Sequence, residues 1–563
     1  SALRSNTTGT SNTAVGVNSL ACNTVGIANT GLGRRTLFAN TTGNFNTAVG
    51  HYALDSATVG YNTAVGGCAL KGTSTGQWNA AMGYGALCRN TVGCGNISIG
   101  HQSSFYNTSG VFNTVVGHNA LLCNTTGSDN TAIGKFSLRS NQSGGNTALG
   151  SYTLFQNTTG LRNTAVGLRA LQSNTIASDN TAIGNFSQFL NTTGYYNTSL
   201  GSFALYANTT GRRNTGIGTF ALKSNSTGAL NTAVGVLSMC STTTGISNTA
   251  LGHITLVCNV TGNSNTALGA AALACNTASN NTAVGFSALG YNTTGTANVA
   301  VGNSALGNNT TGQYNTALGC RALTANTTAS NNTAMGEAAL LNNTTGVNNT
   351  AIGRLSLLGN ITGQSNVAVG FSSLRCNTAG FNTAVGAQAL QYNTTGRYNQ
   401  AVGHLALFYN TTGACNVAVG YAALRSNVVG LNNTAIGVYA LRQNTASNNT
   451  AVGFCALRSN TTGAANTAIG HVSLANNTTG TVNTALGYCS LSLNTTGYQN
   501  TALGFRALRY NTTGNCSTAV GAFSLASNTT GVRNTALGRT SLISNTTGTG
   551  NTAVGAEAMR CNV

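Results

Sequence analysis

The 563-residue chain contains no proline and few charged residues, which make up 5% of the sequence and include only 5 acids. Low charge could indicate a low-complexity segment. However, 41% of the residues are hydrophobic, and they recur in a fixed register, which argues against disorder. No stretch holds about 18 consecutive apolar residues, so no segment is expected to span a membrane. No secretory signal peptide is recognisable.

What the chain does contain is a repeat, Asn-Thr-Ala-Val-Gly, seen complete at residues 12–16. Its first position recurs 33 times between Asn12 and Asn551, and only Ser517 replaces the asparagine. Of the steps between copies, 27 are 17 residues long and 5 are 16 residues long. Self-similarity at a short fixed period indicates a solenoid, in which each unit buries its apolar face only against its neighbours.

Counted from that asparagine as position one, the consensus is N-T-A-V-G-x-x-A-L-x-x-N-T-T-G-x-x. Position four is always aliphatic or methionine, and position nine is leucine except at Ser104, Gln188, Met239 and Met559. Positions six, seven, ten, eleven, sixteen and seventeen vary freely. Position five is glycine in every copy, as at Gly16, Gly33, Gly50, Gly302 and Gly555.

Residues 281–297 match the consensus throughout and illustrate the expected coil. Thr282 to Val284 suit a short strand, because β-branched residues fit a pleated surface. Aliphatic residues replace the threonine in other copies, so we place Thr282 and Val284 on the inner face and Ala283 on the outer face. Gly285 is expected to end the strand with a positive φ or a close backbone approach.

A second strand is expected to begin at Ala288-Leu289, since 17 residues are too few for a pair of helices and the apolar spacing is not helical. Asn292 to Gly295 supply turn chemistry, and equivalent asparagines are expected to stack as a ladder that satisfies their amides. The shorter steps lose their residue in this turn, as at 276–280 and 377–381. A turn can lose a residue without disturbing the strands.

These patterns predict an all-β fold, a parallel β-solenoid (β-roll or β-helix) of about 33 coils. No linker or change of composition divides it, so we expect one continuous domain over residues 1–563. At about 4.8 Å a coil, the rod would be roughly 160 Å long. Positions three and eight stay small, so either the coil is flattened on itself or a second chain packs there. We favour a second and third chain, giving a homotrimeric fibre.

Both ends of the sequence fall inside a repeat, Ser1 at position seven and Val563 at position thirteen. A solenoid cut within a coil exposes open strand edges, which natural solenoids close with capping repeats. We therefore expect the chain to belong to a longer protein or to join end to end into a filament.

The stretches Ala14 to Ser19 and Ala283 to Ala288 resemble the head repeat of trimeric autotransporter adhesins, the YadA-like β-roll. The longer consensus also resembles repeats of tail-fibre and virion-surface fibre proteins. The chain departs from the adhesin pattern in its additional N-T-T-G segment and in lacking a heptad stalk and a membrane anchor. The resemblance implies an extracellular fibrous protein, on a cell or virion surface, that displays or adheres.

Few residues could carry catalysis or hold a metal. The five acids occupy variable positions far apart, so no two carboxylates pair for acid–base work, and the Gly-x-Gly runs belong to the repeat and are not phosphate loops. His101 and His118 lie in adjacent coils but lack further ligands. We expect no enzyme, no metal site and no cofactor.

The formal charge is +19. Spread over roughly 160 Å, this is about one charge per 8 Å, against about one per 1.7 Å in duplex DNA, so we expect no specific nucleic-acid partner. Weak attraction to an acidic glycan or host surface suits this density better, and the alternative is that the charge serves only the solubility of the chain. The surface-binding candidates are Arg34, Arg35, Lys135, Arg169, Tyr195, Tyr196, Arg212 and Arg213.

The fifteen cysteines are odd in number, scattered in register and without a Cys-x-x-Cys pair. They are expected to be free thiols. Cys258 and Cys275 share one register in consecutive coils, so a bond between them is geometrically open. Asn-Thr-Thr is a glycosylation sequon, at Asn6, Asn40 and Asn124 among others, but a stacked turn asparagine explains the recurrence without glycans.

Two function classes remain. The first is a structural fibre or adhesin shaft that binds or spaces through its variable positions. The alternative is an ice- or crystal-surface binder that uses stacked threonines equivalent to Thr293 and Thr294, although the 16-residue steps interrupt that strip.

Overall fold

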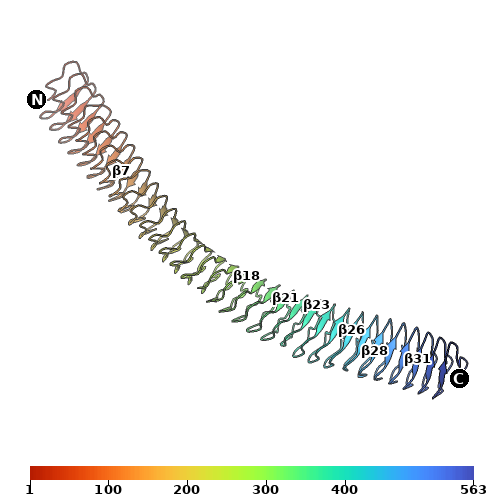
Figure 1. The fold of residues 1–563 in the computed structure, drawn as a ribbon. Coiled ribbons are helices and arrows are strands. Elements are labelled where there is room, and N and C mark those ends of the chain that lie inside the picture. The colour runs from red at the N-terminus through yellow and green to blue at the C-terminus, as the bar shows by residue number, and fades with distance from the viewer. Residues whose placement is uncertain (563) are drawn as a thin grey trace. The chain divides into compact units, whose positions relative to one another are not determined.

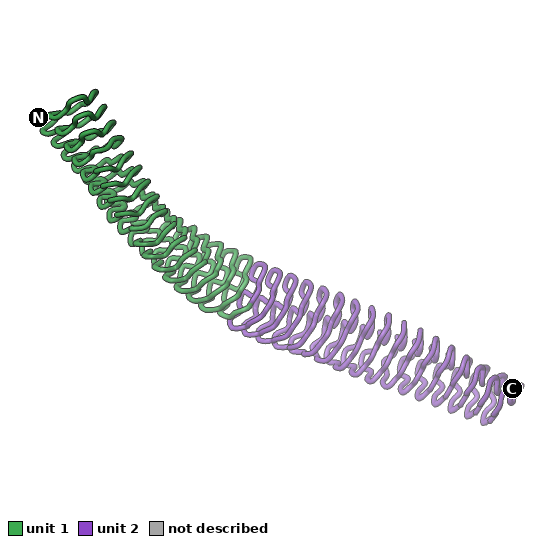
Figure 2. The backbone as a smooth tube through the Cα atoms, turned by 45° about the horizontal axis from the view of Figure 1, so that its top comes forward, with its two compact units in different colours: residues 1–280 green, residues 281–563 purple. Residues whose placement is uncertain are grey.

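A computed structural model describes residues 1–562 of the chain. Each repeat contributes one strand of three residues, and the described residues contain no helix (Figure 1). The chain forms two compact units, residues 1–280 and 281–563, and each is described by itself (Figure 2). The prediction of one continuous domain stays a prediction, and Val563 lies outside the described residues.

The first unit holds the strands β1 (Thr13–Val15), β2 (Thr30–Leu32), β3 (Thr47–Val49), β4 (Thr63–Val65), β5 (Ala80–Met82), β6 (Ile97–Ile99), β7 (Thr114–Val116), β8 (Thr131–Ile133), β9 (Thr147–Leu149), β10 (Thr164–Val166), β11 (Thr181–Ile183), β12 (Thr198–Leu200), β13 (Thr215–Ile217), β14 (Thr232–Val234), β15 (Thr249–Leu251) and β16 (Thr266–Leu268).

The second unit holds the strands β17 (Thr282–Val284), β18 (Val299–Val301), β19 (Thr316–Leu318), β20 (Thr333–Met335), β21 (Thr350–Ile352), β22 (Val367–Val369), β23 (Thr383–Val385), β24 (Gln400–Val402), β25 (Val417–Val419), β26 (Thr434–Ile436), β27 (Thr450–Val452), β28 (Thr467–Ile469), β29 (Thr484–Leu486), β30 (Thr501–Leu503), β31 (Thr518–Val520), β32 (Thr535–Leu537) and β33 (Thr552–Val554).

Within each unit, every strand pairs in parallel with the strand of the next coil. Between β18 and β19, for example, Val299 pairs with Thr316 and Val301 with Leu318. Equal repeat positions are therefore neighbours, as a stack of coils requires. The predicted fold class, an all-β parallel solenoid with a repeat of 16–17 residues, is confirmed.

The middle residue of each strand points into the coil. Ala283 is fully buried, whereas Thr282 and Val284 on either side of it are partly exposed. The middle residue is likewise buried in every strand from β2 to β33. The prediction that Thr282 and Val284 face inward is therefore wrong.

The reason is that the coil is narrow. Its apolar interior consists of the residues at positions three, eight and nine, such as Ala300, Ala305 and Leu306, all 0% exposed. The leucine fills most of this space, so only a small side chain fits at the strand centre. The small residues of positions three and eight thus pack inside their own coil, and the interpretation that further chains pack there is wrong.

The leucine of position nine bends the chain and does not begin a strand. Leu306 has a φ of 50°, and Ser304 two residues earlier has a φ of 53°, a left-handed conformation that residues other than glycine rarely adopt. Leu289 has the same φ of 50°. The prediction of a second strand at Ala288-Leu289 is therefore wrong. The bend is held by backbone bonds between coils, as where the N–H of Leu306 donates to the carbonyl of Ala322 at 3.0 Å.

The glycine of position five is required for two reasons, as the sequence predicts. Gly302 has a φ of +131°, and a Cβ atom added to it would lie 2.5 Å from the carbonyl oxygen of Gly319 in the next coil. The other turn glycines named above also have positive φ, at 128° for Gly16, 133° for Gly33, 122° for Gly50 and 122° for Gly555.

Two columns of buried asparagines run through each unit, which confirms the predicted ladder. At position twelve, Asn309 Nδ2 donates to Oδ1 of Asn292 at 2.7 Å and to the carbonyl of Gly312 at 3.0 Å. At position one, the backbone N–H of Asn298 donates to Oδ1 of Asn281 at 3.0 Å. Because buried amides need partners, these bonds make asparagine the residue that fits both positions.

The same column explains most of the Asn-Thr-Thr sequons. Asn40 and Asn124 are 0% exposed, and Asn40 Nδ2 donates to Oδ1 of Asn23 at 2.9 Å. Neither amide can carry a glycan in the folded coil. Asn6, at the first of these sequons, is exposed.

The 16-residue steps leave the strands in register. Thr47 pairs with Thr63 across one such step and Thr131 with Thr147 across another. The missing residue is absorbed in the turn after position twelve, as predicted. We call the outward side chains of positions two and four the outer sheet face. In the described strands this face carries no charged side chain.

Candidate functional site

Most side chains at the variable positions reach solvent, although small ones such as Ala338 and Ala422 are buried. The side chains of one position stack into a column along each unit. Phe45, Tyr61 and Trp78 occupy one position in successive coils, with ring centroids 5.4 Å and 6.5 Å apart. All three are at least half exposed. A coil therefore presents whatever its variable positions hold in register with its neighbours, and a run of similar residues becomes a continuous strip.

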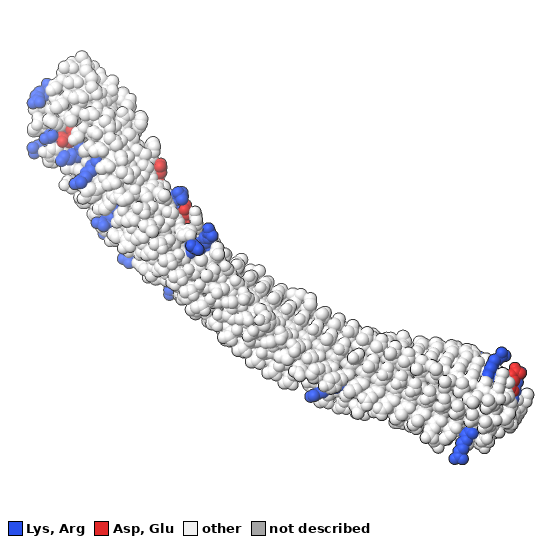
Figure 3. Space-filling model, viewed as in Figure 1, with Lys and Arg blue, Asp and Glu red and all other residues white. Residues whose placement is uncertain are grey.

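Charged side chains are sparse on this surface (Figure 3). Of the candidates named from the sequence, Arg35 is already paired, because its Nε lies 3.0 Å from Oδ1 of Asp55 and its guanidinium lies 4.3 Å from the ring centre of Phe38. Arg34 lies 5.9 Å from the ring centre of Tyr52. Arg34 and Arg35 therefore lie in a local cluster whose charge Asp55 partly neutralises.

Lys135 and Arg169 meet at one aromatic column. Lys135 Nζ lies 5.2 Å from the centre of the Phe136 ring, which packs at 5.1 Å on Tyr152. Arg169 lies 5.8 Å from the Tyr152 ring and 5.7 Å from the Phe186 ring. Cation–π contacts of this kind hold both cations against the surface.

Tyr195, Tyr196, Arg212 and Arg213 lie together. The rings of Tyr195 and Tyr196 meet edge to face at 5.3 Å, and Arg212 Nη1 lies 3.2 Å from the Tyr195 hydroxyl. The backbone N–H of Arg213 donates to the carbonyl of Tyr195 at 3.0 Å. A shallow pocket beside the two rings also includes Asp179, whose carboxylate is paired with Arg162 at 2.7 Å.

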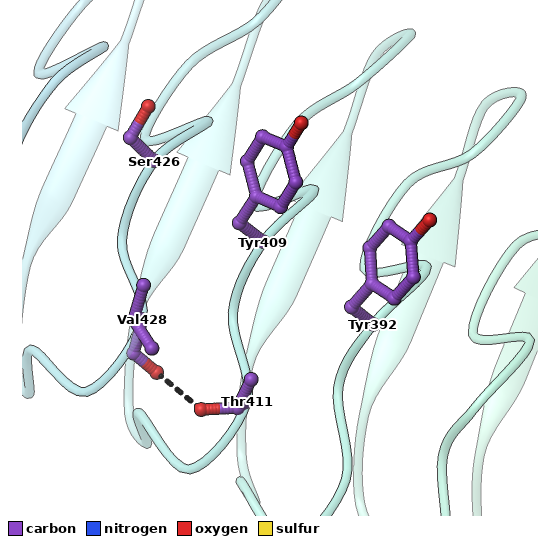
Figure 4. Close-up of a pocket in the computed structure, with 5 residues that line it drawn as sticks. All are labelled: Tyr392, Tyr409, Thr411, Ser426 and Val428. Atoms are coloured by element: carbon purple, nitrogen blue, oxygen red, sulfur yellow. Dashed lines mark hydrogen bonds between the residues drawn. The ribbon is translucent and has the colours of Figure 1, made fainter.

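The structure also brings together residues that the sequence reasoning did not single out. Tyr392 and Tyr409, at position eleven of successive coils, stack with ring centroids 5.8 Å apart and planes only 8° from parallel. In the next coil this position holds Ser426, so one face of the Tyr409 ring borders an open pocket, which Thr411 and Val428 complete (Figure 4). Both rings are about two-fifths exposed, at 41% and 42%.

Three arginines follow one another beside this pocket at position ten: Arg425, Arg442 and Arg458. Backbone bonds align them, because Ser426 N–H donates to the carbonyl of Arg442 at 3.0 Å and Gln443 N–H to that of Arg458 at 3.2 Å. The Arg425 guanidinium lies 5.3 Å from the Tyr409 ring centre. Its Nε is buried and has no hydrogen-bond partner within the chain.

The signal for this site was in the sequence but required the coil register. Tyr392, Tyr409 and the three arginines are far apart along the chain and become neighbours only when positions ten and eleven are aligned between coils. Basic pairs such as Arg34-Arg35 are visible by eye, whereas a column at 17-residue spacing is not.

The histidines show the same stacking without a metal centre. The rings of His101 and His118 are 5.1 Å apart and nearly parallel, at 10°. No group of three or more His, Cys, Asp or Glu residues is suitably placed for a metal ion within residues 1–562. The fifteen cysteines, all in the described part of the chain, are free thiols.

In the part of the chain that the structure describes, no helix has the length and hydropathy needed to cross a membrane. A scan of the sequence against protein-family models and a search of curated proteins gave no match.

Proposed function

We propose that this chain is a structural fibre element, an extracellular shaft at a cell or virion surface, with no catalytic role. The observation that carries the proposal is that the buried and the outward positions of the coil differ in how much their residues vary. The buried positions, such as Ala300, Leu306 and Asn309, recur in almost every repeat, whereas the outward positions change from coil to coil. A constant interior with a varied surface suits a spacer that contacts other molecules through its outward side chains.

The outer sheet face supports lateral self-association, as a homotrimer. Its position-four column leaves large apolar side chains in solvent, with Leu32 47%, Met82 53% and Leu318 42% exposed. Contiguous exposed apolar surface in a soluble protein marks an interaction site. Because the face is uncharged and repeats itself in register, a second copy of the chain can cover it along its length.

The test is the mass of the particle in solution, measured by light scattering or sedimentation over a range of concentrations, together with negative-stain images. We expect the mass of a trimer. Val301→Lys with Leu318→Lys puts charge on the outer sheet face and should lower the mass. Asn303→Lys with Cys320→Lys adds the same charge to an exposed variable position of the same coils and should not. A native monomer would reject the assembly proposal.

Binding to ice or a crystal surface is the second candidate, and one observation favours it. The threonines of position two form an outward column that stays in register across 16-residue steps, as between Thr47 and Thr63. The strip first considered is less suitable, since Thr293 uses its hydroxyl to bond the Thr310 carbonyl at 2.9 Å. Thermal hysteresis of a chain solution separates the candidates: its presence favours the surface binder and its absence the fibre.

A further inference from the structure

We propose that the pocket beside Tyr409, together with the arginine column next to it, is a binding site for an acidic polysaccharide. The site consists of the Tyr392–Tyr409 stack, Ser426, Val428 and the column Arg425, Arg442 and Arg458. It lies entirely within the second unit. The inference rests on the outward display proposed above, and it names the chemistry that one part of the surface recognises.

The shape of the pocket suits a ligand that contains a flat ring. Tyr392 covers one face of the Tyr409 ring at 5.8 Å, and the other face opens at Ser426, where a third tyrosine would continue the stack (Figure 4). A ligand ring lying parallel to Tyr409 takes that place. An aromatic face attracts polarised C–H groups, which a sugar ring presents on one side.

The rim of the pocket matches the rest of a sugar. Val428 replaces the usual threonine of position thirteen, is 38% exposed and adds apolar surface next to the ring. The hydroxyl groups of Tyr392, Tyr409 and Ser426 lie together on one side of the pocket (Figure 4) and can exchange hydrogen bonds with sugar hydroxyls. The Thr411 hydroxyl already donates to the Val428 carbonyl at 3.1 Å, which fixes the pocket wall.

The arginine column gives the site its charge. None of the five acids of the chain lies between residues 338 and 556, so the column has no acidic side chain to neutralise it. Two of the three guanidiniums lie against aromatic rings, Arg425 at 5.7 Å from the ring centre of Phe408 and Arg442 at 5.0 Å from that of Tyr439.

Charge spacing favours a polysaccharide over a nucleic acid. The column offers one cation per coil, about every 4.8 Å, whereas each strand of a DNA duplex carries a phosphate about every 3.4 Å. The acidic groups of a polysaccharide are separated by at least one sugar ring. Stacking on Tyr409 with carboxylates or sulfates over the arginines therefore uses both halves of the site at once.

The experiment is a calorimetric titration of the full chain with four probes: heparin oligosaccharides, oligogalacturonate, its fully methyl-esterified neutral form, and an oligo-dT of similar length. We expect binding of at least one acidic sugar and weaker binding of the neutral form. Tyr409→Ala should lower the affinity for the acidic sugar at least about fivefold, which is the lower end of the range for the loss of one stacking contact. Arg442→Gln should also lower this affinity, and it should reduce the slope of log affinity against log salt concentration by about one.

Matched controls come from the same register elsewhere in the second unit. Tyr510 occupies position eleven, is 43% exposed and has Arg509 at 4.9 Å from its ring centre, but it lacks a stacked partner and an arginine column. Tyr510→Ala and Arg509→Gln should leave the affinity unchanged. Thermal melting should not distinguish Tyr409→Ala from Tyr510→Ala, because both rings are exposed.

Three results would overturn the proposal: no binding of either acidic sugar, equal losses in the Tyr409 and Tyr510 variants, or tighter binding of oligo-dT with the same dependence on Tyr409, which would make this a nucleic-acid site. Particle mass and images do not depend on Tyr409. A failed titration with an unchanged particle mass therefore removes only this inference, while monomeric chains that still bind the sugar remove only the proposed assembly.

Discussion

Replacing the glycine of position five with alanine should open the stack at one defined place. In Gly302→Ala, the new Cβ atom would lie 2.5 Å from the carbonyl oxygen of Gly319 and 2.6 Å from its carbon. The φ of +131° is also a backbone conformation that only glycine adopts without strain. For the alanine it is expected to cost about 1–3 kcal/mol.

The clash acts on the bonds between coils. The N–H of Gly319 donates to the carbonyl of Val301 at 2.8 Å, so moving Gly319 away weakens this bond, worth about 0.5–1.5 kcal/mol. Together the two effects predict a loss of about 2–4 kcal/mol in local stability. Gly307→Ala is the matched control in the same coil: its added Cβ would be 3.2 Å from the nearest atom, the Ser304 oxygen, without a positive φ.

Native-state hydrogen exchange is the suitable assay, because a long repeat array does not unfold in two states and exchange reports the opening of individual coils. Amides in residues 298–330 should lose protection in Gly302→Ala, while distant coils keep theirs. Gly307→Ala should stay within about 0.5 kcal/mol of the parent. If the two variants exchange alike, neither the contact with Gly319 nor the backbone conformation constrains position five.

Three further predictions follow from the coil interior. Leu306→Asp buries a charge where the side chain is 0% exposed and should abolish the exchange protection of its coil, whereas Val301→Asp, on the outer sheet face, should leave that protection within about 0.5 kcal/mol of the parent in the dissociated monomer; a larger loss in Val301→Asp than in Leu306→Asp would mean that the valine points into the coil. Asn309→Ala removes the bonds to Asn292 and Gly312 and should cost about 1–3 kcal/mol in the protection of its coil; unchanged exchange would mean that the ladder contributes nothing. Burial raises the pKa of the Cys275 thiol, so its alkylation by iodoacetamide should accelerate at a higher pH than in the urea-unfolded chain, and coincident pH profiles would contradict this.

The repeat predicted the features that depend on position alone. A parallel register, stacked asparagines and a constrained glycine all follow from the recurrence of the same residue at the same place. Asn309 illustrates this: whatever the shape of the coil, its amide must meet the equivalent amide of the next coil, and it does, at 2.7 Å from Asn292.

The direction of the side chains was not predictable in the same way. Val284 and Ala283 alternate along a strand, and hydrophobicity favours the valine inside. The deciding quantity is the width of the coil, which is set by the sharp bend at Leu289, φ 50°. The presence of a leucine does not indicate a left-handed conformation, so the bend cannot be recognised in the sequence. The wrong prediction of a second strand at Ala288-Leu289 therefore led to the wrong prediction that Val284 faces inward.

The prediction of the candidate site failed for a different reason, because it considered neighbours in sequence and not the register between coils. Reading the chain linearly favours neighbours such as Arg212 and Arg213, yet only the first of them touches the Tyr195 ring. Alignment of the repeats would have revealed the column at Arg425, but not the open ring face of Tyr409, because that requires knowing which side chains point outward.

The pairing of each strand only with the strands of adjacent coils has a genetic consequence. Because one coil offers the next the same backbone donors and acceptors, as at Val299 and Thr316, a coil can be duplicated or lost and the flanking coils still meet a compatible partner. Near-identical repeats in the DNA favour such events through unequal recombination. The length of the array can thus evolve faster than its fold, and a column such as the three arginines can be extended or interrupted in a single step.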